Sequence, residues 1–212
     1  MDIVRIGELL LPFAPSLSDK QLSSISIYLD LLQRWNARMN LTAIRDPETI
    51  VTRHFGESLF AARHLLTATA NSSVIDVGSG AGFPGLPMKL WAQNIQLTLI
   101  ESSQKKATFL REVVRALDLT DIEVFAGRAE SFRGTSDVVT LRAVERFKTA
   151  LPIAAKLLRS EGKIAALISV SQCEIIGKSS LIQWRTPIPV PRSNQRILAI
   201  GLAHLQHQDS TL

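Results

Sequence analysis

Apolar side chains recur at helical spacing through the first 70 residues. Ser18 followed by Gln21 has the pattern of a capping box, and Asp46 followed by Pro47 has the pattern of a second helix start. Between these two starts, the apolar residues spaced three and four apart are Leu22, Ile25, Leu29, Leu32 and Trp35. This spacing predicts one helix from residue 18, a turn at residues 40–42, and a second helix from residue 46 to about residue 66.

After a polar turn at residues 67–72, short β-rich runs alternate with helical segments. The predicted strands cover residues 73–77, 96–101, 122–126, 137–141, 163–170, 182–190 (broken by Pro187 and Pro189) and 196–202. The predicted helices cover residues 84–93, 104–117 and 148–158. This alternation predicts an α/β fold in which a mostly parallel seven-stranded sheet is covered on both faces. We expect a helical cap over residues 1–70 and a sheet-based core over residues 71–212, packed as one unit.

Composition limits the class of protein. Hydrophobic residues make up 46% of the 212 residues and charged residues 20%, so the chain can bury a core and is not disordered overall. No apolar run reaches the roughly 18–20 residues that span a bilayer, and the opening residues lack the basic start of a signal peptide. Cys173, the single cysteine, forms no internal disulfide or cysteine metal cluster. We therefore expect a cytoplasmic protein without a bound metal.

The net charge of +5 is unevenly distributed. The first 71 residues carry equal numbers of basic and acidic side chains, so the whole excess lies in the remainder. Residues 175–207 contain no acid, and their basic residues include Lys178, Arg185, Arg192 and Arg196; a second basic group consists of Lys105, Lys106, Arg111 and Arg115. Such clusters indicate either a polyanionic partner or an ordinary solvated surface, and charge alone leaves both open.

A glycine-rich turn lies between the first predicted strand and a helix. Gly80 to Gly85 match the dinucleotide pattern G-x-G-x-x-G, which is weak on its own. In the other register, Asp76 is followed by Gly78, Gly80 and Gly82, a pattern typical of S-adenosylmethionine (SAM) sites in Rossmann-like methyltransferases. Both registers predict close approach of the backbone to a nucleoside cofactor.

Two carboxylates accompany this turn. Asp76 either accepts hydrogen bonds from the amides of its own turn or faces the ammonium group of a cofactor. Glu101 ends the next predicted strand, where a carboxylate can accept hydrogen bonds from both ribose hydroxyls of an adenosine. Because NAD and SAM sites both expect such an acid, Glu101 indicates a nucleoside cofactor without separating the two classes.

The third and fourth predicted strands also end in candidate groups. Ala129 and Glu130 follow the third strand, in a loop expected to pass an adenine ring; Glu130 contacts its amine or caps the turn. Arg142 ends the fourth strand, where its charge must stay paired or hydrated. We expect it to bind a cofactor carboxylate or an RNA phosphate. The alternative is an ion pair with Glu130 or Glu145.

Residues 76–85, Asp-Val-Gly-Ser-Gly-Ala-Gly-Phe-Pro-Gly, resemble the signature of the bacterial GidB/RsmG family, whose members methylate N7 of one guanine in 16S ribosomal RNA. Residues 28–42 (Y-L-x-L-L-x-x-W-N-x-x-x-N-L-T) resemble the helix and turn near the start of that family. Residues 53–59 (R-H-F-x-E-S-L) also match, with Glu57 in place of the usual Asp. Arg142-Ala143 resembles the S-R-A motif of the family, with Leu141 in place of Ser. The resemblance runs from residue 28 to residue 143, and more loosely to residue 202.

The resemblance implies a Rossmann-like class I SAM-dependent methyltransferase. Its implied cofactor contacts are Gly78, Phe83, Ala129, Glu130 and Arg142, to which the analysis of strand ends adds Gly80 and Glu101. Arg53 and His54, on the helical cap, are predicted to meet RNA, the alternative being a capped helix with a satisfied histidine. The family has Ala-Leu-Lys-Gly on its fifth strand, whereas this chain has Ile168-Ser169 at the last two positions. A basic residue that would face the site or the RNA is therefore missing.

The implied reaction needs no catalytic acid or base, because guanine N7 carries a free lone pair. We expect positioning and exclusion of water to supply the catalysis, so no catalytic residue is predicted. The expected partner is 16S rRNA within the 30S subunit, and the expected state is a monomer. Three alternatives remain: a SAM-dependent methyltransferase acting on another RNA, a small molecule or a protein; an NAD-dependent oxidoreductase; and an RNA-binding module without enzymatic activity.

Overall fold

The computed structural model describes residues 1–142, 147–177 and 182–203. Its helices are α1 (Ile3–Leu10), α2 (Asp19–Met39), α3 (Pro47–Ile50), α4 (Glu57–Leu65), α5 (Gly85–Trp91), α6 (Gln104–Ala116), α7 (Phe147–Ala155) and α8 (Cys173–Gly177), with a π-helical segment η1 (Val51–Gly56) and 3₁₀ turns η2 (Ala129–Ser131) and η3 (Val170–Gln172). Its strands are β1 (Ser73–Val77), β2 (Gln96–Ile100), β3 (Ile122–Phe125), β4 (Ser136–Arg142), β5 (Leu158–Ser169), β6 (Ile182–Trp184), β7 (Ile188–Pro189) and β8 (Arg196–Ala203).

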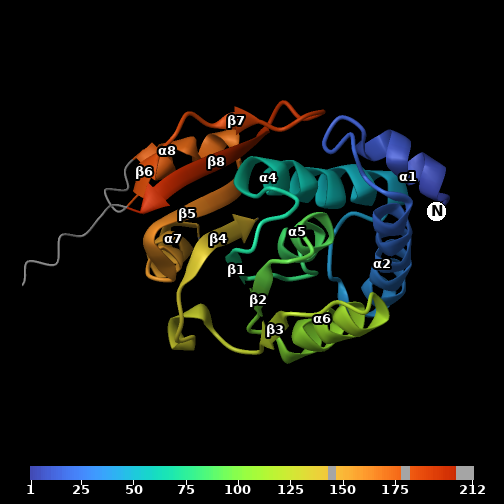
Figure 1. Ribbon diagram of the computed structural model, residues 1–212, viewed down its shortest axis with the longest axis horizontal. Helices are drawn as coiled ribbons and strands as arrows, with labels where there is room; N and C mark the ends of the chain where they lie inside the picture. Colours follow the sequence, from blue (N-terminus) through green and yellow to red (C-terminus); the bar gives the residue numbers. More distant parts are fainter. Residues whose placement is uncertain (143–146, 178–181, 204–212) are drawn as a thin grey trace, which may run out of the picture.

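One sheet in the order β3-β2-β1-β4-β5-β8-β6 organises the molecule (Figure 1). Strands β1 to β5 run parallel to one another, and β8 runs antiparallel to β5, β6 and β7. The predicted mostly parallel α/β fold is therefore confirmed. The sheet has eight strands because the predicted strand over residues 182–190 forms two short strands, β6 and β7, along the same edge of β8.

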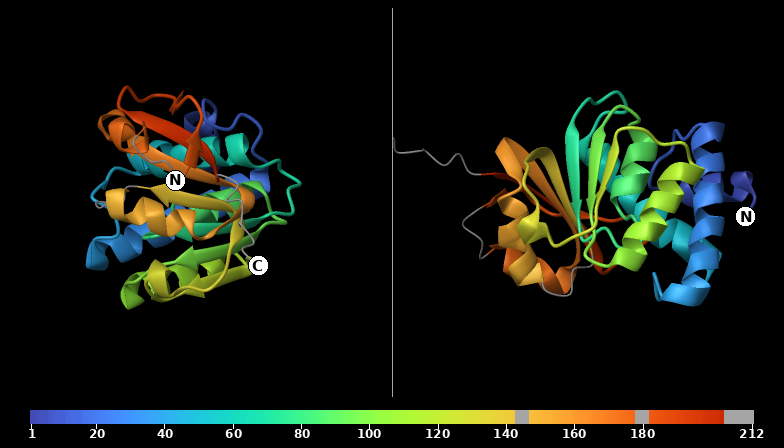
Figure 2. Two further views of the ribbon diagram at one scale, coloured as in Figure 1. Left: turned by 90° about the vertical axis from the view of Figure 1, so that its left-hand side faces the viewer. Right: turned by 90° about the horizontal axis from the view of Figure 1, so that it is seen from below.

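Helices cover both faces of the sheet. Helices α4, α5 and α6 lie on one face with α1 and α2 outside them, whereas α7 and α8 cover the other face (Figure 2). Alternate strand residues supply the two cores: Val74 and Leu167 pack on the first face, and Ile75 and Ile168 on the second. Because the side chains of the helices before residue 70 share the first core with the sheet, the predicted cap is fused to it by continuous apolar packing.

Local capping signals set the boundaries of the first helices. The Ser18–Gln21 capping box and the Asp46 cap with Pro47 at the first turn are both present, as predicted. The predicted helix over residues 46–66 is interrupted by the π-helical segment η1, which inserts between α3 and α4. Such segments are frequent at functional sites, and this one carries Arg53 and His54.

One predicted boundary shifts in the second half of the chain. Helix α7 ends at Ala155, and β5 begins at Leu158, ahead of the predicted strand start at residue 163. The strand includes a turn-like stretch because Glu161 adopts a left-handed backbone (φ 62°) and the pairing with β4 shifts register between Ser136 and Val138. The predicted helix over residues 148–158 is therefore three residues too long at its end.

The buried carboxylate of Asp76, near the end of β1, anchors the glycine turn that follows this strand. This carboxylate is fully buried and accepts hydrogen bonds from the Gly85 amide (3.1 Å) and the Thr140 hydroxyl (2.8 Å). Thr140 lies opposite Asp76 in the β1–β4 pairing, so the sheet register brings donor and acceptor together. Burial raises the Asp76 pKa to about 6, although these hydrogen bonds oppose the shift. The interpretation of Asp76 as an acceptor for its own turn fits this geometry.

Tyr28 anchors the same turn from α2. Its buried hydroxyl donates to the backbone carbonyl of Ala81, and its ring stacks on Phe83 with centroids 5.4 Å apart. The rings of Phe55 and Tyr28 meet edge to face, with centroids 5.0 Å apart. A helix of the cap thereby fixes the shape of the glycine turn.

We expect Tyr28→Phe to lower the free energy of unfolding by about 1–3 kcal/mol, because the Ala81 carbonyl then lies buried without a donor. Chemical denaturation measures the change. Ser24→Ala is the control on the same helix, since it removes a hydroxyl whose carbonyl acceptor, Lys20, can be hydrated instead. Equal stability of Tyr28→Phe and the wild type would contradict the anchoring role.

Asp76 should make stability depend on pH between about 4 and 6. Its pKa in the folded state, about 6, lies above its ordinary value of 3.8, so the native state binds the proton first as the pH falls. The contribution of Asp76 to the unfolding free energy therefore rises as pH falls from 6 to 4, by at most about 1.4 kcal/mol per pH unit. The wild-type curve minus the Asp76→Asn curve isolates this slope. A flat difference would show that Asp76 titrates normally.

Candidate functional site

The candidate site lies at the carboxyl edge of the parallel strands, where β1, β2 and β4 end side by side. The glycine turn follows β1, Glu101 follows β2, and Arg142 is the last residue of β4. The 3₁₀ turn that holds Ala129 and Glu130 follows β3 at the same edge. The topology thus brings the predicted cofactor residues to one side of the sheet, where α/β proteins bind their ligands.

The backbone at Gly78 leaves room for a ligand. Gly78 has a φ of +70°, and no atom lies within 4 Å of the place where a Cβ would stand. Its own amide donates to the Ile100 carbonyl (2.9 Å), so the turn is held open by the neighbouring strand end. Gly80 also has a positive φ, 58°. A flat ligand can therefore approach this backbone without meeting a side chain of the turn.

Glu101 is fixed beside the turn by two backbone amides. One carboxylate oxygen accepts from Gly80 (2.9 Å) and the other from Ser103 (2.7 Å), while the residue is only 6% exposed. Each carboxylate oxygen keeps further acceptor capacity. The arrangement fits the predicted role toward ribose hydroxyls, because the carboxylate is oriented before any ligand binds.

Phe83 lies in an aromatic cluster behind the turn. It is 6% exposed, and its ring stacks between Tyr28 and His54, at centroid distances of 5.4 and 4.9 Å. Phe55 meets it edge-on at 5.1 Å, and the guanidinium carbon of Arg142 lies 5.7 Å from its centroid. Phe83 therefore supports the groups around it, and its predicted contact with the cofactor stays a prediction.

Both ring nitrogens of His54 are engaged within the protein. Nδ1 lies 2.8 Å from Arg142, which can only donate, so the proton resides on Nε2, which donates to the Thr42 hydroxyl (2.7 Å). Burial, followed by the charges of Arg142, Arg53 and Arg196, lowers the His54 pKa to about 2. His54 is therefore neutral at physiological pH, in keeping with the satisfied-histidine alternative. Its predicted RNA contact remains untested.

Arg142 is held in a fixed position by several acceptors. The side chain is 8% exposed, and Nη2 donates to the Arg53 carbonyl (2.7 Å), to His54 and to the Glu57 carboxylate (3.2 Å). Burial lowers its pKa to about 10, so it stays protonated at neutral pH. Its acidic partner is Glu57, which the sequence motif showed only as a replacement for the usual Asp and not as a partner of Arg142. The alternative partner Glu145 lies outside the described residues.

Glu57 is shared by three arginines. Its carboxylate is 1% exposed and lies 2.9 Å from Arg53, 3.2 Å from Arg142 and 3.5 Å from Arg196. We call these four residues the Glu57 cluster. From the sequence, Arg196 was only one member of a basic stretch. Its position at the start of the last predicted strand was the one signal that could have pointed to this site. In the sheet, Arg196 pairs with Ser169 at the end of β5 and thereby reaches the carboxyl edge.

Ile168 does not face the Glu57 cluster. Its side chain is 2% exposed and packs in the core on the α7–α8 face of the sheet. Neighbouring Leu167 points to the opposite face, and its carbonyl accepts a hydrogen bond from Arg196 (3.2 Å). The position at which a family lysine was expected is thus filled by core packing, and Arg196 is a basic group at that strand end.

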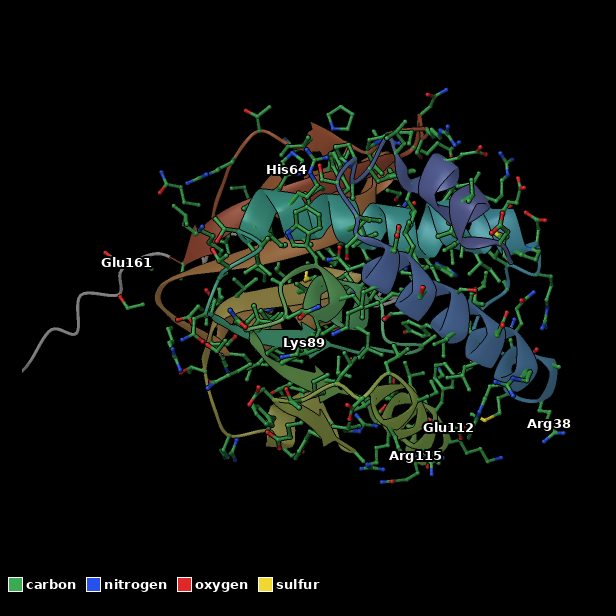
Figure 3. All side chains as sticks on the ribbon, turned by 45° about the vertical axis from the view of Figure 1, so that its right-hand side comes forward. Arg38, His64, Lys89, Glu112, Arg115 and Glu161 are labelled. Carbon is green, nitrogen blue, oxygen red and sulfur yellow. The ribbon has the colours of Figure 1, made fainter. Side chains whose placement is uncertain are left out.

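The second basic group lies on α6. Lys105, Arg111 and Arg115 are exposed, and the side chains of Glu112 and Arg115 project from the outer side of the helix (Figure 3).

In the part of the chain that the structure describes, no three His, Cys, Asp or Glu side chains gather as a metal site requires. No described helix is long and apolar enough to cross a membrane.

Known proteins share this architecture and much of this sequence. A ribosomal RNA small subunit methyltransferase G of Chloroflexus aggregans is 44% identical over 156 residues, which cover 71% of this chain and 65% of that protein. A protein of the same name from Streptococcus pyogenes is 38% identical over 158 residues, covering 72% of this chain and 67% of that protein. The chain thus spans about two thirds of the length of these relatives.

The fold also matches that of a Bacillus cereus O-methyltransferase, solved in complex with SAH. The TM-score is 0.60 at 16% identity, and the match covers 84% of this chain and 90% of that one. The family model described as GidB, rRNA small subunit methyltransferase G, matches residues 21–185. This match confirms the resemblance seen in the glycine turn and its flanking motifs, and the chain belongs to the GidB family.

Proposed function

We propose that this chain is a SAM-dependent methyltransferase that acts on N7 of a guanine in 16S rRNA of the small ribosomal subunit. The observation that carries the proposal is the open, positive-φ backbone at Gly78 beside the fixed carboxylate of Glu101. Membership in the GidB family, whose name describes rRNA small subunit methyltransferases, supports the choice of SAM over NAD and of ribosomal RNA over a small molecule.

The residues of this edge fit SAM in their chemistry. Gly78 and Gly80 offer a path free of side chains, and Glu101 offers acceptors for two ribose hydroxyls. Ala129 and Glu130 lie where the adenine ring would meet the 3₁₀ turn after β3. Arg142, backed by the ring of Phe83, carries the charge that a carboxylate of the cofactor requires.

When bound, SAM supplies an electrophilic methyl group on a sulfonium. Guanine N7 already carries the lone pair that accepts a methyl group, so no side chain has to remove a proton. The work of this chain is to hold both reactants in line and to exclude water. The buried aromatic cluster of Tyr28, Phe55 and Phe83 suits this task, because it makes the wall behind the glycine turn rigid and apolar.

The RNA substrate meets the cap and the basic C-terminal third of the chain in this proposal. Arg53 is 42% exposed on η1 and is therefore the more accessible of the two predicted RNA residues, whereas His54 serves to orient Arg142. N7 faces the deep, narrow major groove of A-form RNA, so the guanine must be unpaired or opened by the subunit. We further propose that the protein acts as a cytoplasmic monomer without a metal ion.

Transfer of labelled methyl groups from SAM tests the proposal. The substrates are 30S subunits from a strain that lacks the homologous enzyme, with naked 16S rRNA alongside, and the product base is identified. We expect label in 7-methylguanosine at a single site. SAM binding without transfer to either substrate would overturn the RNA substrate, and absence of SAM binding would overturn the cofactor.

Gly78→Ala should abolish SAM binding at modest cost to the fold. The new Cβ would stand in the open approach path, and its φ of +70° costs about 1–2 kcal/mol of stability. We expect a loss of SAM affinity of more than about 30-fold by titration calorimetry, with a cooperative unfolding transition retained. Unchanged SAM affinity would remove this turn from the cofactor site.

A further inference from the structure

A cavity of about 300 Å³ is lined in part by Glu57. Its lining residues are Leu9, Phe13, Asp46, Glu48, Thr49, Thr52, Arg53, Glu57, Pro191 and Arg192. The cavity therefore sits between the cap and the loop that joins β7 to β8, two parts far apart in sequence that lie side by side at the top of Figure 1. The predicted cofactor residues are absent from its lining.

The lining of the cavity carries three carboxylates and two guanidinium groups, those of Asp46, Glu48, Glu57, Arg53 and Arg192. In the Glu57 cluster three guanidinium groups surround one carboxylate, and His54 beside them is neutral. Within the described part of the chain, the buried Nε atoms of Arg142 and Arg196 have no hydrogen-bond partner. Buried charges and donors left in this way are costly, but Arg142 and Arg196 do not line the cavity. The cations that a ligand in the cavity would contact are Arg53 and Arg192.

Glu57 itself is directed toward the cavity. It lines the cavity at 1% exposure, and its Oε1, although 2.9 Å from the Arg53 Nε, takes part in no aligned hydrogen bond with a described residue. A buried carboxylate oxygen with spare acceptor capacity is ready for an N–H or O–H group of a ligand.

The other cavity walls combine two kinds of surface. Leu9, Phe13 and Pro191 are apolar, and the hydroxyls of Thr49 and Thr52 belong to α3 and η1. The remaining acids are already partnered: Glu48 pairs with Arg5 (2.8 Å), and Asp46 accepts from the Thr49 amide (2.7 Å). A free inorganic anion would gain nothing from the apolar walls or the carboxylates. A nucleotide would use both, through its base, its sugar hydroxyls and its phosphate.

We propose that this cavity binds one unpaired nucleotide of the RNA substrate, next to the guanine that is methylated. Arg53 and Arg192 hold its phosphate, the apolar walls cover the base, and Glu57 accepts a hydrogen bond from it. The inference rests on the proposed function. We place the nucleotide next to the methyl acceptor because Glu57 lines the cavity and also pairs with Arg142, the last residue of β4 at the candidate site.

Arg192 gives a test that spares the buried residues. It is exposed and adopts a left-handed backbone (φ 56°) in the loop before β8. Arg185 is the matched control, since it is exposed, lies on the same acid-free stretch and does not line the cavity. A second variant, Thr52→Phe, adds bulk to the cavity without changing its charge.

The experiment measures KM and kcat for unmethylated 30S subunits over a range of salt concentrations, together with SAM affinity by calorimetry and thermal unfolding. We expect Arg192→Gln to raise KM for subunits about five- to tenfold, with kcat and SAM affinity retained and the salt dependence of binding reduced by about one phosphate contact. Arg185→Gln should change KM less than about twofold. Thr52→Phe should raise KM while the salt dependence stays that of the wild type.

Three outcomes overturn the inference. Equal KM values for Arg192→Gln and Arg185→Gln would show that only general charge matters. A parallel loss of SAM affinity in Arg192→Gln would assign the cavity to the cofactor. A folded Thr52→Phe with wild-type KM would show that no nucleotide enters the space. In contrast, a wild-type protein that binds SAM and modifies no ribosomal RNA overturns the proposed function, and the inference with it.

Discussion

The structure depends on one buried carboxylate. Glu57 begins α4 and pairs with arginines from three other places: η1, the end of β4 and the start of β8. Without it, three guanidinium groups would repel one another in a poorly solvated space, which costs far more than an exposed ion pair contributes. The docking of the cap on the carboxyl edge of the sheet, and the position of Arg142, therefore follow from the same residue.

The aromatic cluster extends this constraint to the glycine turn. Arg142 lies over Phe83 and donates to His54, whose neutral ring stacks on the same phenyl ring. A protonated His54 would place a fourth positive charge beside the arginines, and its low pKa reflects that cost together with burial. Tyr28 completes the contact by binding the turn at Ala81. The glycine turn, the aromatic cluster and the Glu57 cluster are thus joined by continuous contacts.

Local signals in the sequence predicted the helix caps, turns and strand ends around the candidate site, but not the long-range contacts between them. Ser18, Asp46 and the glycines act on neighbours within a few residues, so caps, turns and strand ends followed from pattern alone. The Arg142–Glu57 contact joins residues 85 positions apart, and no local pattern encodes it. The sequence also did not predict the π-helical segment or the early start of β5, because packing and strand register override the local backbone preference there.

The charge of the Glu57 cluster suggests why two ligands would meet at this place. Its three guanidinium groups exceed its carboxylate by two positive charges, since His54 contributes none. A cofactor carboxylate at Arg142 would balance one of these charges, and an RNA phosphate at the cavity side would balance the other. In the proposed complex, each of these groups would relieve a different part of the same electrostatic cost, although the ammonium and sulfonium groups of SAM would add positive charge nearby.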